Sequence, residues 1–155
     1  MHILLATDGS EIALDATRRG LALLADATKI TLLSVVGDLP TDTGGGIEGP
    51  IYTPDQEADL RRSEMHQAQR ALADTEAVLA KVLPANATIE QRVEPGDPAA
   101  MVCLVARDLG VDVVVIGSHG KGFMSRVLLG SVSEHVARHA PCPVLVVRQT
   151  PVSAP

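Results

Sequence analysis

A cluster of glycines and one serine late in the chain could bind an anion. Gly117 and Gly120 follow a run of strand-forming residues, and Gly130 and Ser131 come ten residues after Gly120. Glycines in a turn let backbone N–H groups approach a ligand closely. Ser131 and Glu134 have the spacing of a capping box, which predicts that a helix begins there. Because free N–H groups at a helix N-terminus attract anions, this segment predicts a phosphate site.

Other phosphate motifs fit the same segment less well. A Walker A loop needs four residues between its glycines and a Ser or Thr after its Lys. Here two residues separate Gly117 from Gly120, and Gly122 follows Lys121. A dinucleotide fingerprint could begin at Gly120, but Ser125 stands at its third glycine position and the segment follows a late strand. A response-regulator receiver would need an acidic pair after the first strand and a Lys after the last, and the chain offers neither.

Polar side chains near these glycines have both a binding and a structural interpretation. Asp8 ends the first predicted strand, where it could contact a ligand or brace its own turn. His119 and Lys121 could contact phosphate or lie in solvent. Arg126 could supply positive charge to a phosphate or lie on the surface.

The histidines and cysteines predict neither a metal site nor a disulfide. His135 and His139 have the i, i+4 spacing of a helical pair, but no third ligand is evident. Cys103 and Cys142 stand in apolar surroundings and outside any CxxC pair, so we expect two buried, reduced thiols. The N-terminus lacks a signal-peptide pattern, and no apolar run approaches the ~20 residues that span a bilayer. We therefore expect a cytoplasmic protein.

The composition argues against nucleic-acid and membrane partners. The chain has 155 residues, which suits one domain, and its 46% hydrophobic content is mostly aliphatic, with no Trp, one Phe and one Tyr. Binding of bases by aromatic stacking is therefore not expected. The net charge of −6 opposes nonspecific binding to nucleic acid or anionic lipid. A local cluster of amides can still bind a small anion.

Strand and helix patterns alternate along the chain. The predicted strands are 2–7, 29–36, 88–93, 111–116 and 144–147. The predicted helices are 11–27, 54–83, 98–109 and 131–139. The inner face of the long second helix is predicted at Met65, Ala68, Leu72, Thr75, Leu79 and Val82. The loop 37–53 is long enough to be either mobile or functional.

This alternation predicts an α/β fold: a single-domain, doubly wound, mostly parallel five-stranded sheet with helices on both faces, which is Rossmann-like. We expect the domain to occupy residues 1–148 and the tail 149–155 to be disordered. Ligands in such folds bind beyond the carboxyl ends of the strands, where the strand order reverses. If the first and fourth strands are neighbours, Asp8 faces the glycine loop that begins at Gly117.

The chain resembles the ATP-binding branch of the universal stress protein family. That branch is marked by Gly, two residues, Gly, nine residues, and Gly followed by Ser or Thr, which here are Gly117, Gly120, Gly130 and Ser131. The resemblance covers nearly the whole chain and implies an adenine nucleotide alpha hydrolase-like fold. It also implies homodimers that pair through the last strand, Val144 to Val147, and an apolar edge strand of this kind tends to pair in any case.

The resemblance further implies which residues contact the nucleotide. They would be Asp8, Val35, Ile116, Gly117, His119, Gly120, Gly130, Ser131 and Val132. Asp8 would contact the adenosine part or a metal, and Val35 would meet the adenine through its backbone. Gly130, Ser131 and Val132 would hold the phosphates.

The sequence therefore predicts an ATP-binding universal stress protein, with ATP bound alone or with Mg²⁺, that acts as a nucleotide-dependent stress-response or regulatory protein. One alternative is a weak Mg²⁺-dependent ATP hydrolase or nucleotidyl transferase. No nucleophile–base arrangement is evident in the sequence, so at most weak ATPase activity is expected. The other alternative is a dimeric interaction module that binds no nucleotide.

Overall fold

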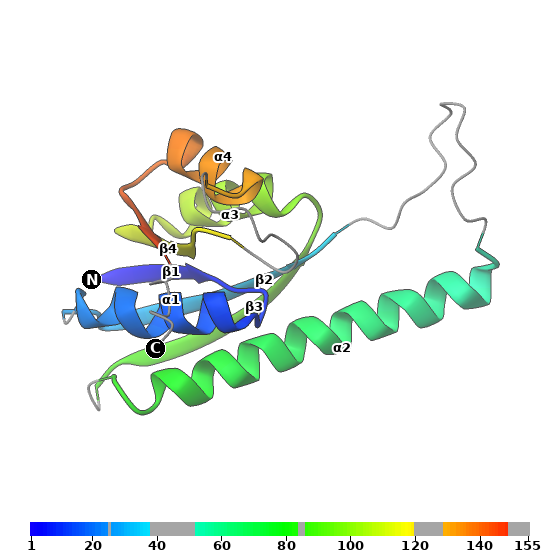
Figure 1. The fold of residues 1–155 in the computed structure, drawn as a ribbon, viewed down its shortest axis with the longest axis horizontal. Coiled ribbons are helices and arrows are strands. Elements are labelled where there is room, and N and C mark those ends of the chain that lie inside the picture. Colours follow the sequence, from blue (N-terminus) through cyan, green and yellow to red (C-terminus); the bar gives the residue numbers. More distant parts are fainter. Residues whose placement is uncertain (25, 38–51, 84–85, 120–128, 149–155) are drawn as a thin grey trace, which may run out of the picture.

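Strands and helices alternate in the computed structural model (Figure 1), which describes residues 1–24, 26–37, 52–83, 86–119 and 129–148. The strands are β1 (His2–Ala6), β2 (Lys29–Val36), β3 (Thr88–Pro95), β4 (Val113–Gly117) and β5 (Val144–Val147). The helices are α1 (Glu11–Ala22), α2 (Pro54–Leu79), α3 (Pro98–Leu109) and α4 (Ser131–His139). The predicted tail 149–155 and most of the loop 37–53 lie outside the described residues.

The five strands form one parallel sheet in the order β3-β2-β1-β4-β5. The chain moves outward from β1 to β3 and then crosses back to place β4 on the other side of β1. The order therefore reverses between β1 and β4, where Ile3 pairs with Val113 and Ala6 with Ile116. The predicted doubly wound parallel sheet is confirmed, and so is the predicted adjacency of the first and fourth strands.

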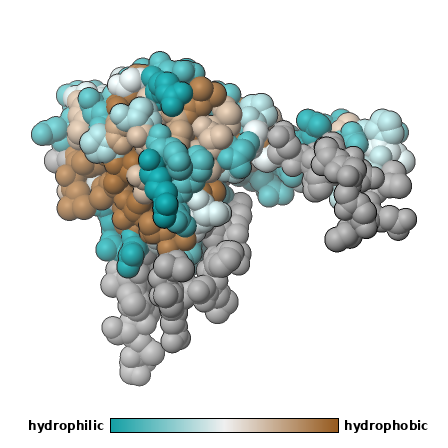
Figure 2. All heavy atoms as spheres, turned by 90° about the horizontal axis from the view of Figure 1, so that it is seen from above, coloured by the Kyte–Doolittle hydropathy of each residue, from teal (hydrophilic) through white to brown (hydrophobic). Residues whose placement is uncertain are grey.

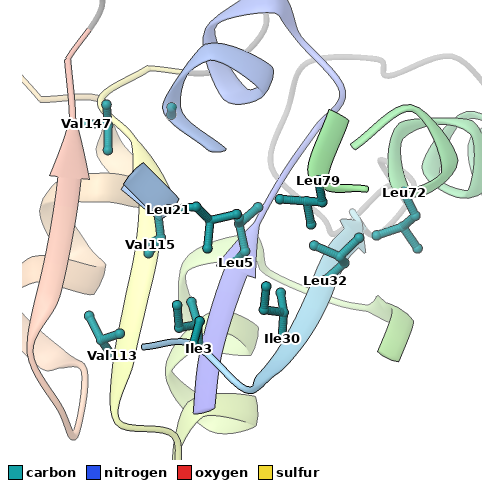
Figure 3. Close-up of a cluster of buried hydrophobic side chains, with 12 residues drawn as sticks. Ile3, Leu5, Leu21, Ile30, Leu32, Leu72, Leu79, Val113, Val115 and Val147 are labelled. Carbon is teal, nitrogen blue, oxygen red and sulfur yellow. The ribbon is translucent and has the colours of Figure 1, made fainter. Parts of the chain in front are cut away.

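Successive strand residues face two separate apolar layers, as strand geometry requires. Ile3 and Leu5 belong to the layer that packs against α1 and α2, which Figure 3 shows in close-up. Leu4 belongs to the layer that packs against α3 and α4. Because helices cover both faces (Figure 1), β1, β2, β4 and β5 carry mainly aliphatic runs. The edge strand β3 is mostly polar.

Side-chain caps explain where three of the helices begin. Ser10, Thr53 and Asp97 each accept a hydrogen bond from the backbone N–H group three residues later. At Thr53 the capping box is complete, since Gln56 returns a hydrogen bond to the Thr53 N–H group. The end of α3 is also as predicted, because Gly110 adopts the left-handed conformation with φ 56° and ψ 45°.

Some predicted boundaries are wrong by a few residues. The first helix ends at Ala22 and the second at Leu79, because backbone hydrogen bonds tighten to i→i−3 spacing just beyond those residues. The third strand continues to Pro95, and the fourth begins at Val113 rather than 111.

The N-terminal half of α2 projects past the carboxyl edge of the sheet (Figure 1). The buried residues of α2 begin at Ala68. Met65 is 38% exposed, so its predicted place on the inner face is wrong, and Val82 at 49% lies beyond the helix end. Figure 2 shows mainly hydrophilic residues on the projecting part. None of the helices that the structure describes is long and apolar enough to cross a membrane.

Candidate functional site

A cavity of about 470 Å³ opens beyond the carboxyl ends of β1, β2 and β4. This volume is in the range typical of small-molecule sites. Eight of the nine predicted site residues line it: Asp8, Val35, Ile116, Gly117, His119, Gly130, Ser131 and Val132. The ninth, Gly120, lies outside the described residues. The sheet order thus brings together residues that are far apart in the sequence.

The turn after β1 forms one wall of the cavity. Asp8 Oδ1 accepts a hydrogen bond from the Ser10 N–H group at 3.0 Å, so Asp8 does brace its own turn. It also lines the cavity, so the structural and binding interpretations are compatible. Gly9 has φ +73°, and a Cβ atom built on it would lie 2.7 Å from Ala71 Cβ. The turn therefore packs directly against α2 and leaves no room for a side chain.

The start of α4 forms the opposite wall and differs from the prediction. Gly130 is the N-cap residue, with φ −64° and ψ 157°, and within the described ranges no side chain makes a capping hydrogen bond to α4. The predicted capping box at Ser131 is wrong, because Ser131 is already the first helical residue and its side chain is exposed. A side-chain cap would compete with a ligand for the same N–H groups. Its absence leaves the first turn of α4 suited to an external anion.

Hydrogen bonds to one carbonyl group hold the end of β4 against the start of α4. The Ser118 carbonyl oxygen accepts from the Gly130 N–H group at 2.7 Å and from the Ser133 hydroxyl at 3.0 Å. Ser133 is buried, and its hydroxyl also lies 2.9 Å from the Gly130 carbonyl oxygen. These contacts fix the N-terminus of α4 relative to the sheet.

Lack of space, rather than backbone conformation, accounts for the two described glycines of the motif. A Cβ atom on Gly117 would lie 3.3 Å from the His119 carbonyl oxygen, and one on Gly130 would lie 3.2 Å from the Ser118 carbonyl oxygen. Neither glycine has a positive φ. The backbone therefore approaches itself closely on the cavity wall, where side chains would force it apart.

The structure describes His119 but not the two basic residues of the predicted site. His119 lines the cavity, and its Nδ1 lies 3.0 Å from the Ser118 hydroxyl. This contact orients the imidazole ring. Lys121 and Arg126 lie outside the described residues.

Sequence reasoning missed the contribution of α2 to the cavity. Glu64 and Gln67 both line it from the projecting half of the helix. Oε2 of Glu64 is buried and makes no hydrogen bond within the described part of the chain. The available signal was periodicity, since Glu64 stands four residues before buried Ala68 and seven before buried Ala71.

The histidine and cysteine predictions can be compared with the structure directly. In the described ranges, no three His, Cys, Asp or Glu side chains are placed to hold a metal ion. The His135 and His139 rings stack with centroids 4.2 Å apart. Both cysteines are free, as predicted, but only Cys103 is buried. Cys142 is partly exposed, so its predicted burial is wrong. Burial raises the pKa of the Cys103 thiol, which favours its unreactive protonated form.

Comparisons with known proteins agree on one family. The model of the universal stress protein family matches residues 1–148. The universal stress protein YxiE of Bacillus subtilis is 29% identical over 146 residues, which cover 94% of this chain and 97% of that protein. Among solved structures, the universal stress protein UspA from Lactobacillus plantarum has a TM-score of 0.75 at 24% identity, covering 96% of this chain and 97% of its own.

A further solved structure is a universal stress protein family protein from Arabidopsis thaliana with AMP bound. It has a TM-score of 0.66 at 19% identity and covers all of this chain and 95% of its own. At these identities the two solved structures show a shared fold. The match of the family model over residues 1–148 establishes that this chain belongs to the universal stress protein family.

Proposed function

We propose that the cavity binds an adenine nucleotide, with ATP as the ligand, and that the chain is a nucleotide-dependent stress-response or regulatory protein. One observation carries this proposal: the pairing of β1 with β4 gathers Asp8, Gly117 and the start of α4 around a single cavity. Strand ends at a reversal of strand order are where such sheets bind ligands.

The start of α4 supports binding of phosphates there. Its N-cap is a glycine without a side-chain cap, so the dipole and the first-turn N–H groups face an incoming anion. Ser131 and Val132 stand in that first turn and line the cavity. Gly120, the remaining glycine of the motif, is assigned to the phosphate path by the sequence pattern alone.

The adenosine part would lie toward the end of β2. Val35 and Val36 line the cavity there, and apolar side chains suit the faces of a purine. The Val35 backbone would meet the adenine edge. The bound AMP in the Arabidopsis protein supports a nucleotide in this fold.

Mg²⁺ fits the site as a partner of the phosphates. Magnesium is commonly held by one or two carboxylates together with phosphate oxygens. Asp8 lies on the cavity wall at the end of β1, and its carboxylate would take this role. The ion would neutralise phosphate charge, and this arrangement also favours slow ATP hydrolysis as a second candidate function. Phosphate release that requires both Mg²⁺ and Asp8, compared between wild type and Asp8→Asn, would establish that second function.

Binding can be tested by thermal unfolding and by analysis of bound small molecules. At a concentration of about 100 times its dissociation constant, ATP is expected to add roughly 2.7 kcal/mol to the free energy of unfolding. Protein denatured directly after purification should release adenine nucleotide. AMP and cyclic AMP, titrated in parallel, identify the preferred ligand. If no nucleotide is released and ATP leaves the melting temperature unchanged, the chain is instead the nucleotide-free dimeric module.

We also propose that two copies pair through β5. This strand lies at the edge of the sheet, and Val144, Leu145 and Val146 are only partly buried. An apolar edge with open backbone groups favours pairing with another strand. Light scattering coupled to gel filtration should give twice the chain mass of 16.2 kDa. A charge on the edge, as in Val146→Lys, should then shift the mass toward that of one chain.

A further inference from the structure

One buried carboxylate oxygen on the cavity wall has no hydrogen-bond partner among the residues that the structure describes. Oε2 of Glu64 is buried and accepts no hydrogen bond from any residue that the structure describes. The same side chain lines the cavity. Buried polar atoms without partners are rare in folded proteins, and each calls for a structural or functional reason. A ligand that donates a hydrogen bond would supply that reason.

The packing of α2 determines where this oxygen lies. Glu64, Ala68, Ala71 and Thr75 follow one another at steps of four, three and four residues, so they share one face of the helix. Ala71 is in contact with the turn at Gly9, which anchors this face to the end of β1. Helical side chains lean toward the N-terminus of their helix. Glu64 therefore continues the buried face past the sheet edge and onto the wall of the cavity.

The position of α2 favours the nucleoside, rather than the phosphates, of the proposed ligand as the neighbour of Glu64. α2 packs on β2 and β3, whereas the start of α4 belongs to the other face of the sheet, beyond β1. A carboxylate would also repel phosphate. Gln67, one turn along α2, lines the same side of the cavity. Both side chains can accept hydrogen bonds.

We propose that Glu64 is a specificity-determining residue, whose Oε2 accepts a hydrogen bond from an N–H or O–H group of the nucleoside. This inference rests on the proposed nucleotide function. Two donors share the required chemistry: the exocyclic amine of adenine and a ribose hydroxyl. Hydrogen bonds to charged groups are the stronger class, so loss of this one should weaken binding by about tenfold or more.

Calorimetric titrations with matched analogues test the assignment. Purine riboside triphosphate lacks the exocyclic amine, and 2′-deoxy-ATP and 3′-deoxy-ATP each lack one hydroxyl. The wild type should bind one of these about tenfold more weakly than ATP. Glu64→Ala should bind ATP and that analogue equally well, and the analogue affected identifies the donor. Glu64→Gln retains a neutral acceptor, so its affinity for ATP should lie between those of the wild type and Glu64→Ala.

Asp74→Asn is the matched control. Asp74 is exposed on α2, and its replacement changes the net charge as Glu64→Gln does. It should bind ATP as the wild type does, and melting curves of every variant establish that each is folded. If the wild type binds ATP but Glu64→Ala keeps the same preference among the analogues, the role of Glu64 is wrong and the proposed function stands. If the wild type binds no nucleotide, both are wrong.

Discussion

Gly9→Ala is expected to lower the free energy of unfolding by about 3 kcal/mol. Gly9 has φ +73°, a conformation that costs other residues roughly 1–2 kcal/mol. A methyl group there would also lie 2.7 Å from Ala71 Cβ and 3.0 Å from its Cα, so the first turn of the site and α2 would have to separate. Overpacking of this kind costs typically 1–3 kcal/mol. Denaturation with urea measures the total loss of unfolding free energy from the backbone conformation and the close contact together.

Gly110→Ala separates the two contributions. Gly110 also has a positive φ, +56°, but no atom lies within 4 Å of the position of its Cβ. Only the conformational cost applies, so the expected loss is about 1 kcal/mol. Equal losses at the two positions would show that the contact between the Gly9 turn and α2 is not tight. The same contact anchors the part of α2 that carries Glu64. Gly9→Ala should therefore also weaken ATP binding, whereas Gly110→Ala should leave it unchanged.

Ser131→Asp is expected to weaken ATP binding by about 100-fold while leaving the fold intact. Ser131 is exposed at the first position of α4 and lines the cavity. A carboxylate about 4 Å from a phosphate charge is repelled by roughly 4 kcal/mol at an effective dielectric constant near 20, and solvent and salt reduce this. The same carboxylate at a helix N-terminus adds about 0.3–1 kcal/mol of stability. Affinity and stability should therefore change in opposite directions.

Ser131→Asn is the neutral control for this substitution. It changes the shape of the side chain in the same way without the charge, so its ATP affinity should stay within about threefold of the wild type. Raising the salt concentration should narrow the difference between the two variants, since the added repulsion is electrostatic. If Ser131→Asp is folded and binds ATP as tightly as the wild type does, the proposed position of the phosphates at the start of α4 is wrong.

The fold could be predicted from the sequence because its signals are local and repeated. Aliphatic runs such as Ile3 to Leu5 and helix signals such as Asp97 before Pro98 act within a few residues. A parallel sheet covered on both faces follows from their alternation. The ends of α1 and α2 were harder to place, because the turns just beyond them tighten to i→i−3 hydrogen bonds that have no sequence signature.

Only part of the candidate site could be predicted from the sequence. Glycine spacing identified Gly117 and Gly130, and at both positions a Cβ atom would sit tightly against a backbone carbonyl oxygen. The cap of α4 was assigned to the wrong residue because Ser131 has the right type for a cap but stands one position too late. Glu64 was missed because its burial depends on where α2 crosses the turn at Gly9. That crossing is a tertiary contact, and local patterns do not encode it.

The central position of β1 has a consequence for how the chain folds. β1 pairs with β2 through Ile3 and Ile30, but its other edge pairs with Val113, which lies far along the chain. Contacts across so long a separation form slowly, and an open apolar edge is prone to wrong association until they do. The chain up to Pro95 holds β1, β2 and β3 together with α1 and α2. The cavity also takes a wall from β4 and the start of α4, so it is complete only once those elements have joined the sheet.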